Sequence, residues 1–182
     1  PDSIQTVEEL DDVLTRPSAE LIKLMGELDG DIMVIGAAGK MGPTLTRRIK
    51  RAIDAAGVKK TVYATARRPL PEFDAWGVKT LQCGLLEDNA AEELPDVENV
   101  IYMVGRKFGS QGNEWLTWAT NTIIPAVIGR RYCKSRIVTF STGCVYPLVH
   151  KDTGGSVETD APAPVGEYAM SCLGRERMFD YF

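Results

Sequence analysis

The sequence predicts an α/β fold in which a doubly wound parallel sheet lies between two layers of helices, the three-layer α/β/α arrangement. From residue 31 onward, short apolar runs alternate with stretches of helical periodicity, which is the pattern of strand-helix-strand units. Several runs are rich in β-branched residues and lack in–out alternation, which indicates strands buried on both faces beneath helices. With 182 residues, the chain is long enough to build one such domain around a sizeable core.

Residues 1–29 are predicted to form a short helical appendage ahead of the sheet. Thr6 and Glu9 have the spacing of a capping box, which indicates a helix start. Pro17 suits the start of a second helix, because a helix does not use its first backbone N–H groups. The remaining residues, 30–182, are predicted to form the α/β domain.

The periodicity places the elements of this domain along the chain. Strands are expected at 31–35, 61–65, 78–82, 99–104 and 136–141. Helices are expected at about 41–56, 87–93 and 113–132, and from about residue 167. Glycine and proline pairs mark residues 147–166 as the one long loop.

Three glycines follow the first apolar run at intervals of three residues, in the stretch DIMVIGAAGKMG. In a strand-turn-helix unit, Gly36 would permit the tight turn, Gly39 would let a ligand approach the backbone, and Gly42 would let the helix pack closely. The helix begins near Lys40 and Met41, where free N–H groups and the positive end of the helix attract phosphate. A tight turn without a ligand would also use glycine, but the position between a strand and a helix favours a Rossmann-type dinucleotide site.

The end of the second predicted strand bears on which dinucleotide binds. An acidic residue there would accept hydrogen bonds from the adenosine ribose and favour NAD. The sequence has Ala66, Arg67 and Arg68 instead, and arginine forks suit the 2′-phosphate of NADP. The cofactor is therefore NAD or NADP, with NADP slightly favoured; the alternative is that both arginines are solvated residues at a strand end.

Composition argues against several classes of protein. The formal charge of −4 disfavours a nucleic-acid-binding surface, which needs a basic stripe. No apolar stretch approaches the ~20 residues that span a bilayer, and no secretory leader is visible, so we expect a cytoplasmic protein without a membrane partner. The four cysteines form no C-x-x-C pair, so we expect reduced thiols and no metal site.

Two later stretches carry a resemblance to a known family. RIVTFSTGCVYP, followed by VETDAPAPVGEYAMSC, resembles the extended short-chain dehydrogenases/reductases, the NAD-dependent epimerase/dehydratase group. That group has GxxGxxG, a Ser/Thr-x-x-Val-Tyr turn after the fifth strand, and a proline-rich loop leading to Tyr-x-x-x-Lys. The similarity covers residues 31 to 176 and implies the same fold.

The resemblance also implies a set of cofactor-binding residues. The glycine turn would hold the pyrophosphate and Arg67 would neighbour the adenosine ribose. Leu85 would border the adenine, although Gly84 stands where the family usually has an aspartate. Val104 and Gly105 would line the nicotinamide side, and Lys107 would reach cofactor or substrate phosphates.

The same resemblance implies three catalytic residues. Tyr168 matches the family's acid/base tyrosine, Thr142 matches the hydroxyl that orients the reacting carbonyl, and Asn121 matches a helix asparagine near the active site. In the family, a lysine four residues after the tyrosine lowers the pKa of the phenol. Cys172 occupies that position here, and a thiol supplies no positive charge.

Three interpretations of this departure remain open. The protein is an enzyme with a rearranged site, acting on a hydroxyl or carbonyl of a sugar-like, nucleotide-sugar substrate, with Lys107, Lys151 or Arg175 as the replacement cation. Alternatively, it binds the cofactor without catalysis and serves as a sensor or assembly partner. In the third interpretation, the chain is an incomplete record of a longer enzyme.

The third interpretation comes from the last predicted helix. The chain stops at Phe182, inside that helix, so we expect the C-terminal substrate region of the family to be absent. Such a fragment would expose an apolar face containing Leu173, Met178 and Phe179. A second copy of the chain, in a homodimer, is one partner that would cover this face.

Overall fold

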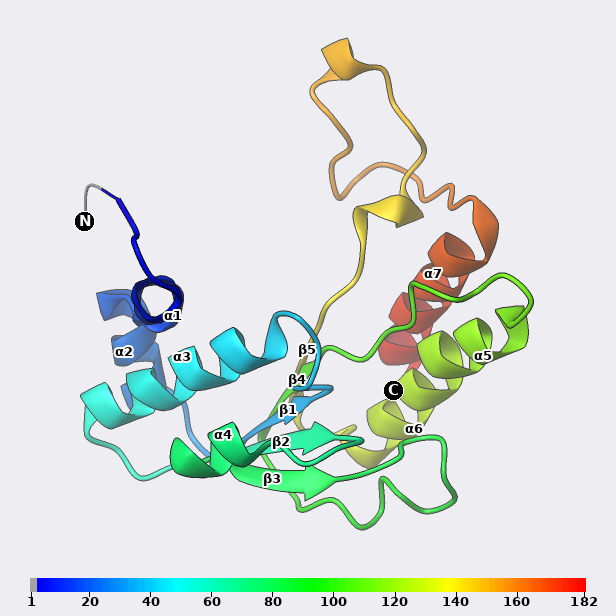
Figure 1. Ribbon diagram of the computed structural model, residues 1–182. Helices are drawn as coiled ribbons and strands as arrows, with labels where there is room; N and C mark the ends of the chain where they lie inside the picture. Colours follow the sequence, from blue (N-terminus) through cyan, green and yellow to red (C-terminus); the bar gives the residue numbers. More distant parts are fainter. Residues whose placement is uncertain (1–2) are drawn as a thin grey trace. The chain divides into compact units, whose positions relative to one another are not determined.

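The computed structural model describes residues 3–182 (Figure 1). The chain divides into two compact units, each with its own packing. The first unit contains the residues up to Gly84, Leu94–Met103 and Lys134–Val138; the second contains Leu85–Glu93, Val104–Cys133 and Thr139–Phe182. The predicted division into residues 1–29 and 30–182, whose first two residues lie outside the described part, stays a prediction.

A five-stranded sheet organises the first unit, and it confirms the predicted fold class. The strands are β1 (Ile32–Ile35), β2 (Val62–Ala66), β3 (Lys79–Gln82), β4 (Asn99–Tyr102) and β5 (Arg136–Thr139). Their spatial order is β3-β2-β1-β4-β5, and β1 pairs in parallel with both β2 and β4. This order, with the first strand between the second and the fourth, is that of a doubly wound Rossmann-type sheet.

All five predicted strands exist. The first three begin within one residue of the expected positions, whereas the last two end two residues earlier than expected, at Tyr102 and Thr139. Every residue of β1 is buried, as expected for a central parallel strand covered on both faces. The edge strands are less buried, which explains why their sequences are more polar.

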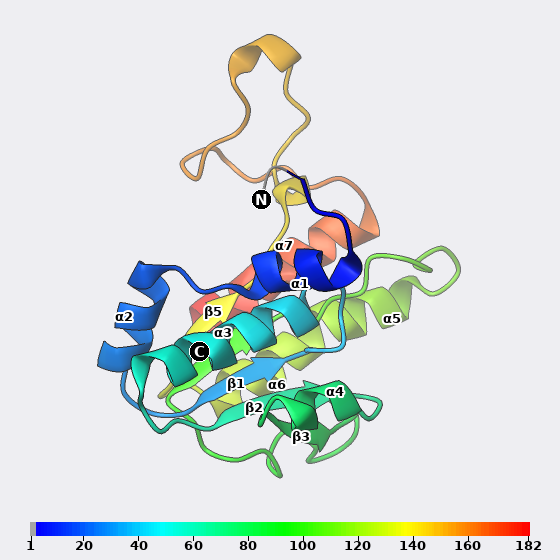
Figure 2. The same ribbon diagram turned by 60° about the vertical axis from the view of Figure 1, so that its left-hand side comes forward.

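Helices α1 (Val7–Thr15), α2 (Ala19–Glu27) and α3 (Gly42–Ala56) lie on one face of this sheet (Figures 1 and 2). The predicted capping interaction at the chain start is present, because the Thr6 hydroxyl accepts the Glu9 N–H at 3.1 Å. The second helix starts at Ala19 with Ser18 as its cap, so Pro17 lies just before the helix. Met25 of α2 is buried in the same core as β1, so the N-terminal helices pack as part of this unit.

A side chain of α3 fastens α1. Arg51 donates hydrogen bonds to the Thr15 hydroxyl at 2.8 Å and to the Asp12 carbonyl at 3.3 Å, and it forms an ion pair with the Asp12 carboxylate at 2.9 Å. We expect Arg51→Ala to lower the free energy of unfolding by about 1 kcal/mol and to speed hydrogen exchange in α1. Lys23→Ala is the control, because Lys23 is exposed and reaches its partner Glu27 only at 3.8 Å. Equal exchange in both variants would show that Arg51 does not hold α1.

The second unit is largely helical. Its helices are α5 (Glu114–Trp118), the π-helical turn η1 (Ala119–Ile123), α6 (Ile124–Arg131) and α7 (Gly166–Tyr181). The first three form the helix predicted at 113–132, and α7 packs against them. Between β5 and α7 the chain makes a long excursion that contains the predicted loop 147–166 and only two short 3-10 turns, η2 (Gly143–Val145) and η3 (Lys151–Thr153) (Figure 1).

Two short segments differ from the prediction. The prediction of a helix at 87–93 is wrong, because the segment is a series of turns. Asn89 has a positive φ of 60°, and its carbonyl accepts the Glu92 N–H. Asparagine tolerates the left-handed conformation that interrupts a helix. A short helix that the periodicity did not show, α4 (Pro71–Ala75), precedes β3, because five residues are too few to reveal a helical period.

Residues 3–182 contain neither a membrane-crossing helix nor a cluster of metal ligands. None of the helices in this range combines the length and the apolar character needed to cross a bilayer. Within the same range, no three histidine, cysteine or acidic side chains are grouped so that they could hold a metal ion. None of the four cysteines is joined in a disulfide.

Candidate active site

The glycine turn leaves β1 as a tight, hydrogen-bonded bend. Gly36 has a φ of 87°, a conformation that favours glycine. Its N–H donates to the hydroxyl of Thr65 in β2 at 3.2 Å. Gly39 N–H then donates to the Gly36 carbonyl at 3.2 Å, and Gly42 N–H to the Gly39 carbonyl at 3.0 Å. Thr65 was not predicted from the sequence, although its place at the end of β2 puts it beside the turn.

Gly42 and Gly39 are glycines for different reasons. A Cβ at Gly42 would lie 2.0 Å from the Ala37 carbonyl oxygen, so only glycine lets α3 start this close to the strand exit. A Cβ at Gly39 would meet its nearest neighbour, the Gly36 carbonyl oxygen, at an ordinary 3.5 Å. Gly39 is also exposed. The protein itself therefore does not require glycine at position 39, whereas a ligand approaching the backbone would.

The start of α3 offers its positive end without a protein counter-charge. Met41 is the N-cap residue and makes no side-chain capping hydrogen bond, and the first turn contains no acidic residue. Lys40 and Met41 are both exposed. Free N–H groups at a helix start attract anions, so this arrangement fits a pyrophosphate bound against Gly36, Gly39, Lys40, Met41 and Gly42.

Arg67 lies at the same edge of the sheet as the glycine turn. Ile35 pairs with Thr65 across the two strands, so the residues just after each strand are neighbours. Arg67 and Arg68 are both exposed, and the backbone carbonyl of Arg67 accepts a hydrogen bond from the Gln82 side chain at 3.3 Å. Both residues therefore follow the end of β2 that adjoins the glycine turn.

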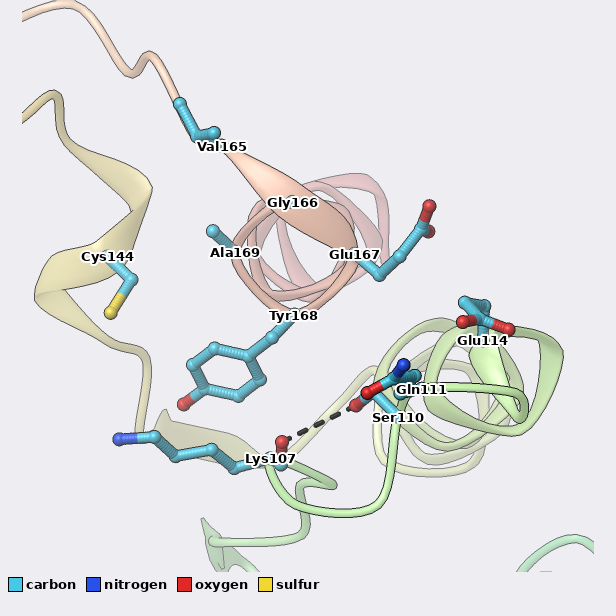
Figure 3. Close-up of a pocket in the computed structure, with 10 residues that line it drawn as sticks. All are labelled: Lys107, Ser110, Gln111, Glu114, Cys144, Val165, Gly166, Glu167, Tyr168 and Ala169. Atoms are coloured by element: carbon cyan, nitrogen blue, oxygen red, sulfur yellow. Dashed lines mark hydrogen bonds between the residues drawn. The ribbon is translucent and has the colours of Figure 1, made fainter.

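In the second unit, Tyr168 lines a cavity of about 370 Å³ (Figure 3). The lining residues come from the loop before α5, from η2 and from the start of α7: Lys107, Ser110, Gln111, Glu114, Cys144, Val165, Gly166, Glu167, Tyr168 and Ala169. Lys107 runs beneath the Tyr168 ring, with its ammonium nitrogen 5.7 Å from the ring centre. The carboxylates of Glu114 and Glu167 lie away from the phenol oxygen (Figure 3).

Of the three predicted catalytic residues, Tyr168 lines this cavity, whereas Thr142 and Asn121 are not among its lining residues. The pKa of Tyr168 is raised above its ordinary value, and burial is the main cause. Cys172 raises this pKa further. A hydrogen bond with the Thr142 hydroxyl and the positive charge of Arg175 both lower it, without offsetting burial. The Thr142 hydroxyl thus acts on the pKa of Tyr168, and the catalytic roles of the two residues stay a prediction. Burial also raises the pKa of the Cys172 thiol, which Arg175 partly offsets.

Asn121 lies beneath this site in a buried network. The π-helical turn η1 contains it, and π-helical turns often occur at functional sites. Its carbonyl oxygen accepts from the Arg106 N–H at 2.8 Å and from Arg175 at 3.1 Å. Its amide nitrogen donates to the Arg106 carbonyl at 3.0 Å and to the Ser171 hydroxyl at 2.9 Å. Protein groups therefore fill the hydrogen-bonding capacity of this amide; Arg106 and Ser171 were not predicted.

The remaining predicted cofactor residues also lie in the second unit. Leu85 is buried, Val104 is partly buried, and Gly105 and Lys107 are exposed. A Cβ at Gly105 would lie 2.7 Å from a terminal nitrogen of Arg175. Glycine at position 105 thus leaves room for the guanidinium of Arg175.

Comparison with known proteins places the chain among relatives. The model of the family described as "NAD dependent epimerase/dehydratase family" matches residues 32–182. No curated protein sequence matches the chain.

Several solved structures share the fold. MoeE5, in complex with UDP-glucose and NAD, is 23% identical with a TM-score of 0.68, over 82% of this chain and 48% of that one. The ADP-L-glycero-D-manno-heptose-6-epimerase of Helicobacter pylori is 13% identical with a TM-score of 0.70, over 84% and 51%. The UDP-glucuronic acid 4-epimerase of Bacillus cereus, in complex with NAD, is 17% identical with a TM-score of 0.64, over 81% and 50%. The chain spans about half the length of these structures.

Proposed function

The chain belongs to the NAD-dependent epimerase/dehydratase family, and from that premise we propose that it binds NAD or NADP at the glycine turn and acts as an epimerase, dehydratase or reductase. The observation that carries the proposal is the exposed Gly39 beside an uncapped helix start. Neither feature serves the packing of the chain itself, and both suit a bound pyrophosphate.

The proposed substrate is a hydroxyl or carbonyl of a nucleotide sugar. The structure of MoeE5 holds UDP-glucose with NAD, and the Bacillus cereus and Helicobacter pylori relatives are named for nucleotide-linked sugars. In this chain, Lys107 reaches into the cavity of Tyr168, where its ammonium suits a phosphate oxygen of such a substrate.

The bound nicotinamide would accept or donate the hydride. The residues of the chain would orient the substrate and transfer the proton. Thr142 would hydrogen-bond the substrate oxygen, and Tyr168 would take a proton from a hydroxyl or donate one to a carbonyl. Because the pKa of Tyr168 is raised, the phenol is protonated at neutral pH and is ready to donate. The opposite direction needs the phenolate. Asn121 would position Ser171 and Arg175 from below the site.

Calorimetric titration with NADH and NADPH tests cofactor binding, and mass spectrometry of nucleotide released from the purified protein tests it independently. Binding with a micromolar constant supports the proposal; no binding of either cofactor removes it. Turnover of a panel of nucleotide sugars by the cofactor-loaded chain then separates an enzyme from a cofactor-binding sensor or assembly partner. The comparisons lend no support to the second role.

The preference for NADP is a separate prediction. Arg67 and Arg68 are exposed at the end of β2, where a 2′-phosphate would gain charge-assisted hydrogen bonds. We expect Arg67→Ala with Arg68→Ala to weaken NADPH binding on the order of tenfold or more and to leave NADH binding unchanged. Exposed Arg130→Ala, on α6, is the matched control. Equal weakening of both cofactors would indicate that the arginines do not read the 2′-phosphate.

A further inference from the structure

Arg175 is a buried cation held by neutral groups. Its side chain lies on α7, and the residue is 5% exposed. The guanidinium donates to the Phe140 carbonyl at 2.7 Å, to the Asn121 carbonyl oxygen at 3.1 Å and to the Cys172 sulfur at 3.5 Å. Among residues 3–182, no carboxylate forms an ion pair with it. Its positive charge is therefore fixed in place and is not neutralised by a partner.

Such a charge acts on its surroundings. Removing a guanidinium from water is costly unless something compensates the charge, and the same low dielectric extends the reach of an uncompensated cation. Tyr168, Cys172 and Arg175 follow at intervals of four and three residues, so they share one face of α7. On this face, the guanidinium of Arg175 stabilises the negatively charged form of any neighbour that can ionise.

Several titratable or charged groups face Arg175, Cys172 and Tyr168 from the packed elements. They are Cys172, Tyr168 and Glu176 on α7, Cys144 near η2, and Arg106 and Lys107 in the loop after β4. Arg106 directs its guanidinium to the Gly109 carbonyl at 2.8 Å, and Glu176 accepts from the exposed Ser141 hydroxyl. Cys172 has a raised pKa and stays a neutral thiol at pH 7. Tyr168 is the remaining group on this face that must ionise during the proposed reaction.

Resting on the proposed function, we propose that Arg175 is a positioning residue that supplies the fixed positive charge for Tyr168. It takes the role that the family resemblance assigns to a lysine at the position of Cys172. The guanidinium folds back along α7 until it touches Cys172, so the cation sits beside the place of that lysine although the residue lies three positions later. Burial is the largest cause acting on the pKa of Tyr168 and keeps it raised; the positive charge of Arg175 is the smallest cause, and it lowers this pKa.

The other two candidate cations are less suitable. Lys151 is 83% exposed and pairs with Asp152 at 2.9 Å, so its charge is both solvated and neutralised. Lys107 lies over two aromatic rings, at 5.7 Å from Tyr168 and 5.6 Å from Phe108, but it is an exposed side chain on a flexible stem. Water screens such a charge. Only Arg175 combines burial with a fixed geometry.

A tyrosine titration tests this proposal without substrate or cofactor. The chain has six tyrosines, so the protein is labelled with ¹³C-tyrosine and the Tyr168 resonance is assigned from Tyr168→Phe. We expect Arg175→Gln to move the Tyr168 titration to higher pH, Arg175→Lys to restore it, and Arg177→Gln to leave it unchanged. Arg177 is the matched control because it lies on the same helix, is exposed and pairs with Asp180 at 3.0 Å. An unmoved Tyr168 titration in a folded Arg175→Gln variant overturns the proposal.

Should Arg175→Gln fail to fold, Gly105→Ala provides the same readout. A Cβ at position 105 meets the guanidinium at 2.7 Å and displaces it while its charge is retained elsewhere. The Tyr168 titration should again move to higher pH. A titration that stays in place while the Arg175 side-chain resonances shift would overturn the proposal.

A double variant adds a test in turnover. We expect Arg175→Gln to lower kcat/KM for hydroxyl oxidation at pH 7 on the order of tenfold, and Cys172→Lys in that background to recover most of the loss. In the unaltered chain, Cys172→Lys should give no gain, because a second buried cation would lie against the guanidinium. A large gain from Cys172→Lys alone would show that Arg175 does not supply the charge. If the chain turns over no substrate, the proposed function fails, but the tyrosine titration still decides this inference.

Discussion

Tyr168→Phe is expected to lower turnover on the order of a thousandfold, because a positioned acid/base group contributes about 10²–10⁴ to a rate. The phenylalanine ring keeps the packing of Tyr168 against Lys107 and removes only the hydroxyl that interacts with Thr142. Cofactor affinity should stay within about twofold, because the pyrophosphate is proposed to bind at the glycine turn. Steady-state kinetics and a calorimetric titration on the same preparation measure both quantities.

The pH profile gives an independent check on the same residue. The raised pKa of Tyr168 means that the phenolate is scarce at neutral pH, so kcat/KM for oxidation should rise about tenfold per pH unit up to that pKa. In the reducing direction the protonated phenol is the active form, so the rate should be flat at neutral pH and fall above the pKa. Tyr146→Phe, which alters a neighbouring tyrosine outside the cavity lining, is the control. Full activity in Tyr168→Phe would remove this tyrosine from the mechanism.

Much of the fold was predictable because its elements repeat a simple period. β1 is a continuous apolar run and is buried throughout, so its sequence indicates both its conformation and its central place in the sheet. The position of the glycine turn was predictable because its three glycines directly follow the apolar run; of these, Gly36 and Gly42 have a local geometric cause. The segment 87–93 was not, because its alanines and glutamates favour a helix while the positive φ of Asn89 interrupts it.

The candidate site residues could be named from the sequence, but the contacts that they make could not be predicted. Tyr168 and Thr142 are separated by a long loop, and the family resemblance alone paired them; the Thr142 hydroxyl is one of the groups that lower the pKa of Tyr168. Three candidate cations could be named from the sequence, but it does not choose among them, because burial of a charge depends on residues far along the chain. Phe140 and Asn121 bind Arg175 across 35 and 54 residues, and no local period reveals such contacts.

Gly42→Ala is expected to lower the free energy of unfolding by about 3 kcal/mol, at the upper end of the usual cost of overpacking. The added Cβ would lie 2.0 Å from the Ala37 carbonyl oxygen and 2.5 Å from its carbon. Both are backbone atoms, so no side chain can move aside, and α3 must shift away from the turn. Because that shift also moves the N–H groups of the turn, cofactor affinity should fall together with stability. Chemical denaturation and calorimetric titration measure the two losses.

Gly39→Ala separates the two roles that the glycine turn is proposed to have. Its Cβ meets only an ordinary contact at 3.5 Å, so stability should change by less than about 1 kcal/mol. The methyl group would nevertheless occupy the exposed surface where the pyrophosphate is proposed to lie, so we expect NADH and NADPH affinity to fall on the order of tenfold or more. If Gly39→Ala bound both cofactors normally while Gly42→Ala only lost stability, the turn would be a packing device and the cofactor would have to bind elsewhere.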